Sequence, residues 1–195
     1  MALGFVRPAR PEDAGEIARI QLTTWRTAYR RMFPAHVLAN LDVMFHMVTD
    51  EGTPLDRAEM RELLSEAIEG AGHRVSSYQL APDEPSRVTV LLDELARGGE
   101  ARVVLLNGGT GISRRDNTYE VVSRRIEKEI PGFGELFRML SWEQVGAAAM
   151  LSRAVAGVSG GMILISVPGS PAAVRLAWEK LIAPELEHLA WEVGR

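Results

Sequence analysis

Apolar positions from residue 43 onward fall alternately into short runs and into helical spacings, and this alternation predicts an α/β fold. The runs typical of strands are 43–49, 75–80, 103–106, 154–158 and 162–167. The segments with helical spacing are 56–71, 85–97, 118–129, 133–140 with a further short helix, and a terminal segment that reaches about Val193. We therefore expect a three-layer α/β/α domain with a mostly parallel sheet and a ligand crevice at the carboxyl ends of its strands.

Glycine and proline residues mark the expected ends of these elements. Gly72 and Gly98-Gly99 stand where two helices should stop, and Pro131-Gly132 should close the helix that begins at residue 118. Gly160-Gly161 predicts a tight turn, so the strands on either side of it should pair as a hairpin. The turn Pro168–Pro171 then leads into the terminal helix.

Residues 1–42 differ from the rest of the chain. They carry six arginines against four carboxylates, whereas the whole chain has a net charge of −4. Their pattern predicts a brief strand at Phe5-Val6 and a helix from Pro11 to about Arg31. We treat 1–42 as a helical N-terminal extension and 43–195 as the main domain.

Composition narrows the class of protein. The 195 residues are enough for one substantial core with an appendage, and 46% hydrophobic with 25% charged residues is ordinary for a globular protein. The negative net charge argues against a general nucleic-acid-binding protein.

Without cysteine there are no disulfides, thiolate metal sites or cysteine nucleophile. No apolar run reaches transmembrane length and no signal-peptide core is visible, so we expect a cytoplasmic protein.

The segment after the expected strand 103–106 carries the strongest functional signal. Gly108, Gly109 and Gly111 fall within four residues, and Arg115 and Asp116 follow before a helical pattern begins. Glycines allow backbone N–H groups to converge on an anion, and the start of a helix adds its positive end. A carboxylate beside that anion could bind a metal ion or orient a nucleophile. Glycines at a strand-to-helix turn also occur for geometry alone, so the loop by itself decides nothing.

Two further aspartates, Asp50 and Asp83, also follow expected strands. Parallel strands end at one edge of a sheet, so both could converge with Asp116. Carboxylates around a phosphate site suggest magnesium-assisted phosphoryl or nucleotidyl transfer. Asp50 and Asp83 could equally cap helices, and capping is also the simpler role for Ser170.

Residues 43–195 resemble the MoaB/Mog family of molybdenum-cofactor biosynthesis proteins. The resemblance is carried, in family order, by Gly108–Gly111 with Arg115-Asp116, Pro131–Ser141, Ala149–Ala154 and Pro168–Val174, and Pro82–Glu84 also fits. It implies an α/β domain that binds molybdopterin and assembles as a homotrimer or homohexamer. In active members this domain transfers an adenylyl group from Mg-ATP to the pterin phosphate and releases pyrophosphate.

The resemblance also implies roles for individual residues. The molybdopterin-binding positions would be Gly108, Gly109, Thr110, Gly111, Ser141, Gly169 and Ser170, with the glycines at the terminal phosphate. Asp83 and Asp116 would be catalytic and would hold Mg²⁺, and Asp50 and Asp56 would face the nucleotide.

The chain departs from the family pattern in three places. Asn107 stands where a threonine is usual, and Ser113-Arg114 replaces a residue followed by proline. Asp56–Glu59 stands where Mog-like members have Asp-Arg-Ser-Gly, so a serine and a glycine expected near the nucleotide are missing. A non-catalytic molybdopterin-binding or scaffold protein is therefore the alternative to an adenylyltransferase.

Residues 1–42 resemble the opening of a GNAT acetyltransferase. The segment Val6–Ala14, followed by Trp25, Ala28-Tyr29 and Pro34, carries this likeness. The acetyl-CoA pyrophosphate loop does not appear later in the chain, so the acetyl-transfer site would lack its anion cradle. We expect a fused remnant or appended cap whose helices dock on their own or a neighbouring copy of the main domain, away from the glycines. A residual acetyltransferase is the least favoured function.

Overall fold

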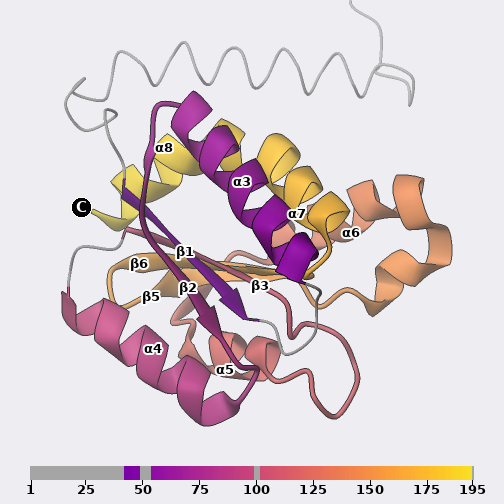
Figure 1. The fold of residues 1–195 in the computed structure, drawn as a ribbon, viewed down its shortest axis with the longest axis horizontal. Helices are drawn as coiled ribbons and strands as arrows, with labels where there is room; N and C mark the ends of the chain where they lie inside the picture. Colours follow the sequence, from indigo (N-terminus) through magenta and orange to yellow (C-terminus); the bar gives the residue numbers. More distant parts are fainter. Residues whose placement is uncertain (1–41, 49–53, 99–101, 195) are drawn as a thin grey trace, which may run out of the picture. The chain divides into compact units, whose positions relative to one another are not determined.

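The computed structural model describes residues 42–48, 54–98 and 102–194, which form an α/β structure around one sheet (Figure 1). The strands are β1 (Asp42–Val48), β2 (Arg74–Ala81), β3 (Val103–Asn107), β4 (Lys128–Glu129), β5 (Val155–Ser159) and β6 (Met162–Val167), in the order β2-β1-β3-β6-β5-β4. β2, β1, β3 and β6 are parallel, and β5 is antiparallel to β6 and β4. The expected α/β class is confirmed, and the sheet is mixed because of β5.

Helices cover both faces of the sheet. They are α3 (Pro54–Gly70), α4 (Pro85–Gly98), α5 (Thr118–Arg125), α6 (Pro131–Val145), the 3₁₀ helix η2 (Gly146–Leu151), α7 (Pro171–Ala177), the π-helix η3 (Trp178–Ile182) and α8 (Ala183–Val193). Figure 1 shows α3, α6, α7 and α8 on one face, with α4 and α5 on the other. The two hydrophobic clusters follow the same division, since Phe137 and Leu186 belong to one and Val88 and Val122 to the other.

The central strands β3 and β6 are buried along their whole length. Alternate side chains enter opposite clusters: Leu105 and Ile165 pack towards α3, α6 and α8, while Leu106 and Leu164 pack towards α4 and α5. This explains the unbroken apolar runs in the sequence, because a strand covered on both faces has no solvent side.

Three parallel strands end together at one edge of the sheet. Asn107 at the end of β3 is in register with Met47 of β1 and with Val167 of β6. The expected convergence of strand-end loops is seen after β2 and β3, because Asp83 bonds to the amide of Asn117 and packs against Gly109. The turn after β6 reaches the same edge. Asp50 follows β1 but lies outside the described residues, and so does the side chain of Asp56.

Two of the expected turns are confirmed in detail. Gly72 has a φ of 83°, and the amide of His73 donates to the carbonyl of Ile68, which completes the helix stop after α3. Gly160 and Gly161 have φ values of 56° and 77° and join β5 to β6 as a hairpin.

The helix expected over 118–129 is confirmed for residues 118–125, and the prediction is wrong for the last four residues. α5 ends at Arg125, and Lys128-Glu129 form β4, which pairs with β5. A Cβ atom at Gly157 of β5 would lie 2.5 Å from the side chain of Ile126 and 2.6 Å from the carbonyl oxygen of Lys128. Glycine at this position therefore admits the edge strand, and helical spacing in the sequence could not reveal that contact.

The α-helices near the carboxyl end also differ from expectation. Pro131 does not close a helix but stands in the first turn of α6, where proline is tolerated. The terminal segment is not one regular helix, because η3 separates α7 from α8. Pro184 in the first turn of α8 has no N–H for the carbonyl one turn earlier, which accounts for the shifted hydrogen bonding of η3.

The N-terminal extension, residues 1–41, lies outside the described residues, and so do its expected strand and helices. The sequence pattern predicts that Asp42 is the last residue of the extension, but it is the first residue of β1. Within the described ranges, no helix has the length and apolar character needed to cross a membrane.

We expect the free energy of unfolding to fall as the pH drops below about 6.5, because of His73. The side chain is buried and its Nδ1 has no hydrogen-bond partner within the described structure. Burial lowers the pKa of His73 from 6.5, and the nearby Glu187 carboxylate offsets only part of this effect. The unfolded chain therefore binds a proton at His73 at a higher pH than the folded protein does. The free energy of unfolding that depends on neutral His73 is complete above pH 7 and is lost as the pH falls.

Melting temperatures of the wild type and His73→Gln between pH 8 and pH 5 measure this effect. The variant should lose less stability than the wild type across that interval, and the offset between the two proteins at pH 8 serves as the control. Parallel curves at every pH would show that His73 does not contribute.

Candidate functional site

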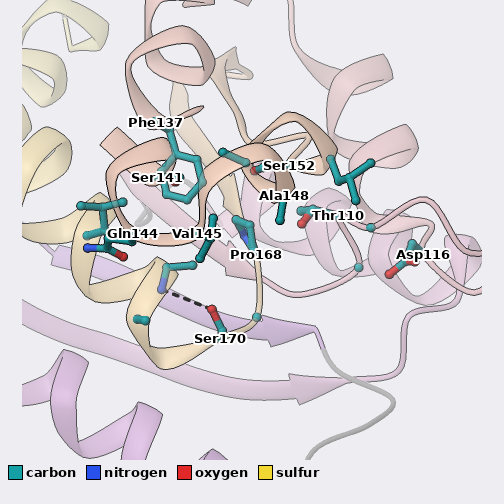
Figure 2. A pocket seen from close by; sticks show the side chains of 18 residues that line it. Thr110, Asp116, Phe137, Ser141, Gln144, Val145, Ala148, Ser152, Pro168 and Ser170 are labelled. Atoms are coloured by element: carbon teal, nitrogen blue, oxygen red, sulfur yellow. Dashed lines mark hydrogen bonds between the residues drawn. The ribbon is translucent and has the colours of Figure 1, made fainter. Parts of the chain in front are cut away.

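A cavity of about 340 Å³ lies at the carboxyl ends of β3 and β6 (Figure 2). Its walls come from the glycine loop, defined as residues 108–116, from α6 and η2, and from the turn after β6 with α7. The lining residues are Gly109, Thr110, Gly111, Asp116, Phe137, Ser141, Gln144, Val145, Ala148, Ala149, Leu151, Ser152, Pro168, Gly169, Ser170, Ala172, Ala173 and Leu176. In Figure 2, Thr110 and Asp116 lie towards one end, and Gln144 and Ser170 towards the other.

The conformation of the glycine loop requires glycine at specific positions. Gly108 and Gly109 have φ values of 104° and 62°, which favour glycine over any residue with a Cβ atom. A Cβ at Gly109 would also lie 2.5 Å from a carboxylate oxygen of Asp83, and one at Gly111 would lie 2.6 Å from the carboxylate of Asp116. The loop therefore turns tightly and packs directly against both aspartates.

Asp83 lies behind the loop and is not part of the cavity lining. It is buried, with a relative exposure of 7%. Its Oδ1 accepts a hydrogen bond from the hydroxyl of Thr118 at 2.8 Å, and its two carboxylate oxygens lie 3.1 and 3.2 Å from the backbone nitrogen of Asn117. These bonds fasten the start of α5, so Asp83 works as a cap that comes from another element of the fold.

Asp116 lines the cavity and accepts a hydrogen bond from the backbone N–H of Ser113 at 2.8 Å. Partial burial alone would raise the pKa of Asp116. Hydrogen bonds from Ser113 and from the backbone of Gly111, together with the positive charge of Arg153, outweigh burial and lower this pKa below its ordinary value. The carboxylate is therefore ionised at neutral pH and carries its charge at the edge of the cavity.

The two aspartates thus lie on different sides of the glycine loop. Within the described residues, no three histidine, aspartate or glutamate side chains gather closely enough to hold a metal ion by themselves. Mg²⁺ at a phosphate-transfer site commonly uses only one or two carboxylates and takes its other ligands from substrate phosphates and water. A single ionised carboxylate at Asp116, beside a loop suited to phosphate, fits that pattern.

The remaining positions named from the sequence divide in a similar way. Ser141 and Gly169 line the cavity, as does Ser170, whose Oγ accepts a hydrogen bond from the backbone N–H of Ala173 at 3.3 Å and so caps α7. Gly108 does not line the cavity, and its Cα would lie 3.2 Å from a Cβ built at Gly169. Gly108 therefore sets the contact between the two strand-end loops.

Sequence reasoning missed three features of the site. Arg153, quoted only as part of a motif, donates from Nε to the carbonyl of Thr110 at 3.0 Å, across 43 residues of sequence. Asn107, noted only as a departure, is buried and its Oδ1 has no hydrogen-bond partner in the described part of the chain. The apolar lining from Phe137, Val145 and Leu176 was also not identified, because in the sequence it is indistinguishable from core.

Comparison with known families decides the class of protein. A family model described as a probable molybdopterin binding domain matches residues 48–188, more than half of the chain. The chain belongs to this molybdopterin-binding family. Over 132 residues it is 48% identical to molybdenum cofactor biosynthesis protein B of Halalkalibacterium halodurans, covering 67% of this chain and 78% of that protein. It is 42% identical to the Bacillus subtilis protein of the same name over 151 residues, covering 76% and 89%.

Solved structures of the family show the same fold. A crystal structure of molybdenum cofactor biosynthesis protein B is 43% identical, with a TM-score of 0.75, and the match covers 80% of this chain and 97% of that one. The tungsten cofactor synthesizing protein MoaB from Pyrococcus furiosus is 31% identical, with a TM-score of 0.69 over 84% of this chain and 100% of that one. The resemblance of residues 43–195 is thereby confirmed. The acetyltransferase resemblance of residues 1–42 receives no support, since the family match begins at residue 48.

We expect Gly109→Ala to lower the free energy of unfolding by about 2 kcal/mol or more, because a Cβ there meets both a positive φ and Asp83. Gly132→Ala in α6 is the matched control. Its Cβ would have no atom within 4 Å, so this variant should be as stable as the wild type or slightly more stable. Urea unfolding of the two variants measures the difference, and equal stabilities would contradict the packing described for the glycine loop.

Proposed function

We propose that this protein acts in molybdenum cofactor biosynthesis as a molybdopterin adenylyltransferase. The observation that carries the proposal is the cavity in which the glycine loop and the ionised Asp116 face an apolar wall. Family membership supports molybdopterin as the ligand, and a 32% identical structure from Thermus is described as a molybdopterin biosynthesis enzyme. The adenylyl transfer itself is the step that goes beyond these findings.

The cavity offers separate surfaces to the two parts of molybdopterin. Phe137, Val145 and Leu176 provide apolar contact area for a ring system, and the Ser141 hydroxyl adds a polar group beside them. The glycine loop would bind the terminal phosphate through backbone N–H groups. A volume of about 340 Å³ is in the range of small-molecule sites.

In the proposed reaction, an oxygen of the pterin phosphate attacks the α-phosphorus of ATP, a new P–O–P bond forms, and pyrophosphate leaves. Mg²⁺ held near Asp116 would neutralise charge on the phosphates. The chain contributes by fixing the attacking phosphate in the glycine loop and by keeping the Asp116 carboxylate ionised. Asp50 and Asp56 remain proposed nucleotide-binding positions.

Asp83 has a different place in this proposal from Asp116. Its carboxylate would have to give up its bonds to Asn117 and Thr118 to reach the cavity. We therefore assign the direct role in metal binding and catalysis first to Asp116, while Asp83 contributes by holding the loop against α5.

Asp116→Asn should reduce adenylylation of molybdopterin by roughly 100-fold or more, because it removes the charge beside the phosphates while keeping the side-chain size. Glu143→Gln is the matched control, since this exposed carboxylate of α6 stands outside the cavity lining. Formation of adenylylated pterin from Mg-ATP measures the effect. Wild-type turnover in Asp116→Asn would overturn the role of Asp116.

The departure at Asp56–Glu59 favours one other function, that of a non-catalytic molybdopterin-binding or scaffold protein. Titration calorimetry separates the two: binding of the pterin without any binding of Mg-ATP favours the scaffold. The same measurement with acetyl-CoA tests the residual acetyltransferase, which we do not expect to bind it.

We also propose that the chain assembles as a homotrimer or homohexamer. Among the described residues, large apolar side chains are exposed along α6 and η2, namely Leu136, Met139, Trp142, Val145, Met150 and Leu151. We call these six residues the α6 patch. A monomer rarely exposes so many large apolar groups together, and Val145 and Leu151 also line the cavity. A second copy on the α6 patch would therefore lie beside the ligand site.

Met139→Glu combined with Trp142→Glu should lower the mass in solution, because two charges in the α6 patch oppose its burial between copies. Val90→Glu is the control, since Val90 is an exposed apolar residue on α4, on the other face of the sheet. Sedimentation equilibrium of both variants and the wild type measures the assembly. An unchanged mass in the double variant would place the interface elsewhere.

A further inference from the structure

Arg153 lies in the segment before β5 and contacts both the beginning and the end of the glycine loop. Its Nε donates to the carbonyl of Thr110 at 3.0 Å, and its Nη2 donates to the carbonyl of Gly111 and lies 3.5 Å from the carbonyl of Asp116. Arg153 is not among the residues that line the ligand cavity. Arg153 therefore acts on the cavity through its hydrogen bonds to the loop and through its positive charge, which also acts on Asp116.

The guanidinium is itself held in place by the first turn of α5. It forms an ion pair with the carboxylate of Glu120, and it lies over the ring of Tyr119 at 4.6 Å from the ring centre. Both partners lie within four residues of the end of the glycine loop. One side chain thus connects the beginning of the loop, its end and the helix that follows it.

Peptide geometry gives these contacts a direction. In a trans peptide, the carbonyl of one residue and the N–H of the next point to opposite sides. The Asp116–Asn117 peptide shows this directly, since its carbonyl faces Arg153 while its N–H donates to Asp83. The Thr110 carbonyl faces Arg153 as well, and the N–H of Gly111 points to the Asp116 carboxylate.

We infer that Arg153 is a positioning residue for phosphate binding: by holding the carbonyls of Thr110 and Gly111 on its own side, it fixes the backbone of the glycine loop, including the Gly111 N–H that orients Asp116 at the edge of the cavity. The inference rests on the proposed function in one respect, that the anion bound there is the pterin phosphate. Lysine cannot take over this task, because one ammonium group lacks the planar set of donors that meets several carbonyls and Glu120 at once.

The first measurement needs no ligand. Hydrogen exchange of backbone amides should become at least tenfold faster in residues 108–117 of Arg153→Lys, while the amides of β3 and β6 stay protected. Arg138→Lys is the matched control, since within the described residues the hydrogen bond of Arg138 is a 3.5 Å contact to the carbonyl of Ser152, outside the loop. Unchanged exchange in the loop of Arg153→Lys would overturn the inference.

The second measurement compares molybdopterin with its dephosphorylated form by titration calorimetry. Arg153→Lys should weaken binding of the phosphorylated ligand about tenfold or more and leave the other ligand unaffected, since the apolar wall does not depend on the loop. Equal weakening of both ligands would indicate a general structural defect and would overturn the inference. A wild type that does not prefer the phosphorylated ligand would refute the phosphate assignment in the proposed function, while the exchange result would still decide the role of Arg153.

Glu120→Gln provides a second variant in case Arg153→Lys does not fold. It leaves Arg153 in place and removes the charge that orients the guanidinium. Loop exchange and loss of phosphate preference should change in the same direction as in Arg153→Lys, by a smaller factor. A Glu120→Gln protein that matches the wild type in both measurements would count against the inference.

Discussion

The glycine loop follows a strand that is buried along its whole length, and side chains from two other parts of the fold hold its peptide groups in place. Asp83 supplies acceptors on one side and Arg153 supplies donors on the other. Other groups of the loop bond within it, as the amide of Asp116 does to the carbonyl of Ser113. Glycine at 109 leaves room for Asp83, and glycine at 111 leaves room for Asp116. The cavity, the start of α5 and the placement of Asp116 all follow from this arrangement.

Asp83 and Asp116 show how environment separates two residues of the same type. Both follow strands of the parallel part of the sheet, yet Asp83 is buried against α5 while Asp116 lies at the edge of the cavity. The buried carboxyl group accepts bonds from a backbone amide and a hydroxyl, so its hydrogen-bonding capacity is used within the fold. The other carboxylate keeps its charge directed towards a ligand.

The site is supported from its apolar side as well. α6 contributes Phe137 to the core and Ser141 and Val145 to the cavity, and its outer residues belong to the α6 patch. One helix therefore connects the core, the ligand site and the surface where we propose a second copy to bind. A change in assembly would reach the cavity through this helix and through η2.

The sequence alone determined the strand positions, the β5–β6 hairpin, the glycine loop and the family, because each depends on local patterns or on motifs that are contiguous in the chain. Only the tertiary structure decided that residues 128–129 form a strand, since that depends on the missing side chain of Gly157, about 30 residues away. It also placed Asp83 behind the loop and Arg153 across from it. Contacts between residues 34 and 43 positions apart leave no periodic trace in a sequence, so apolar spacing could not reveal them.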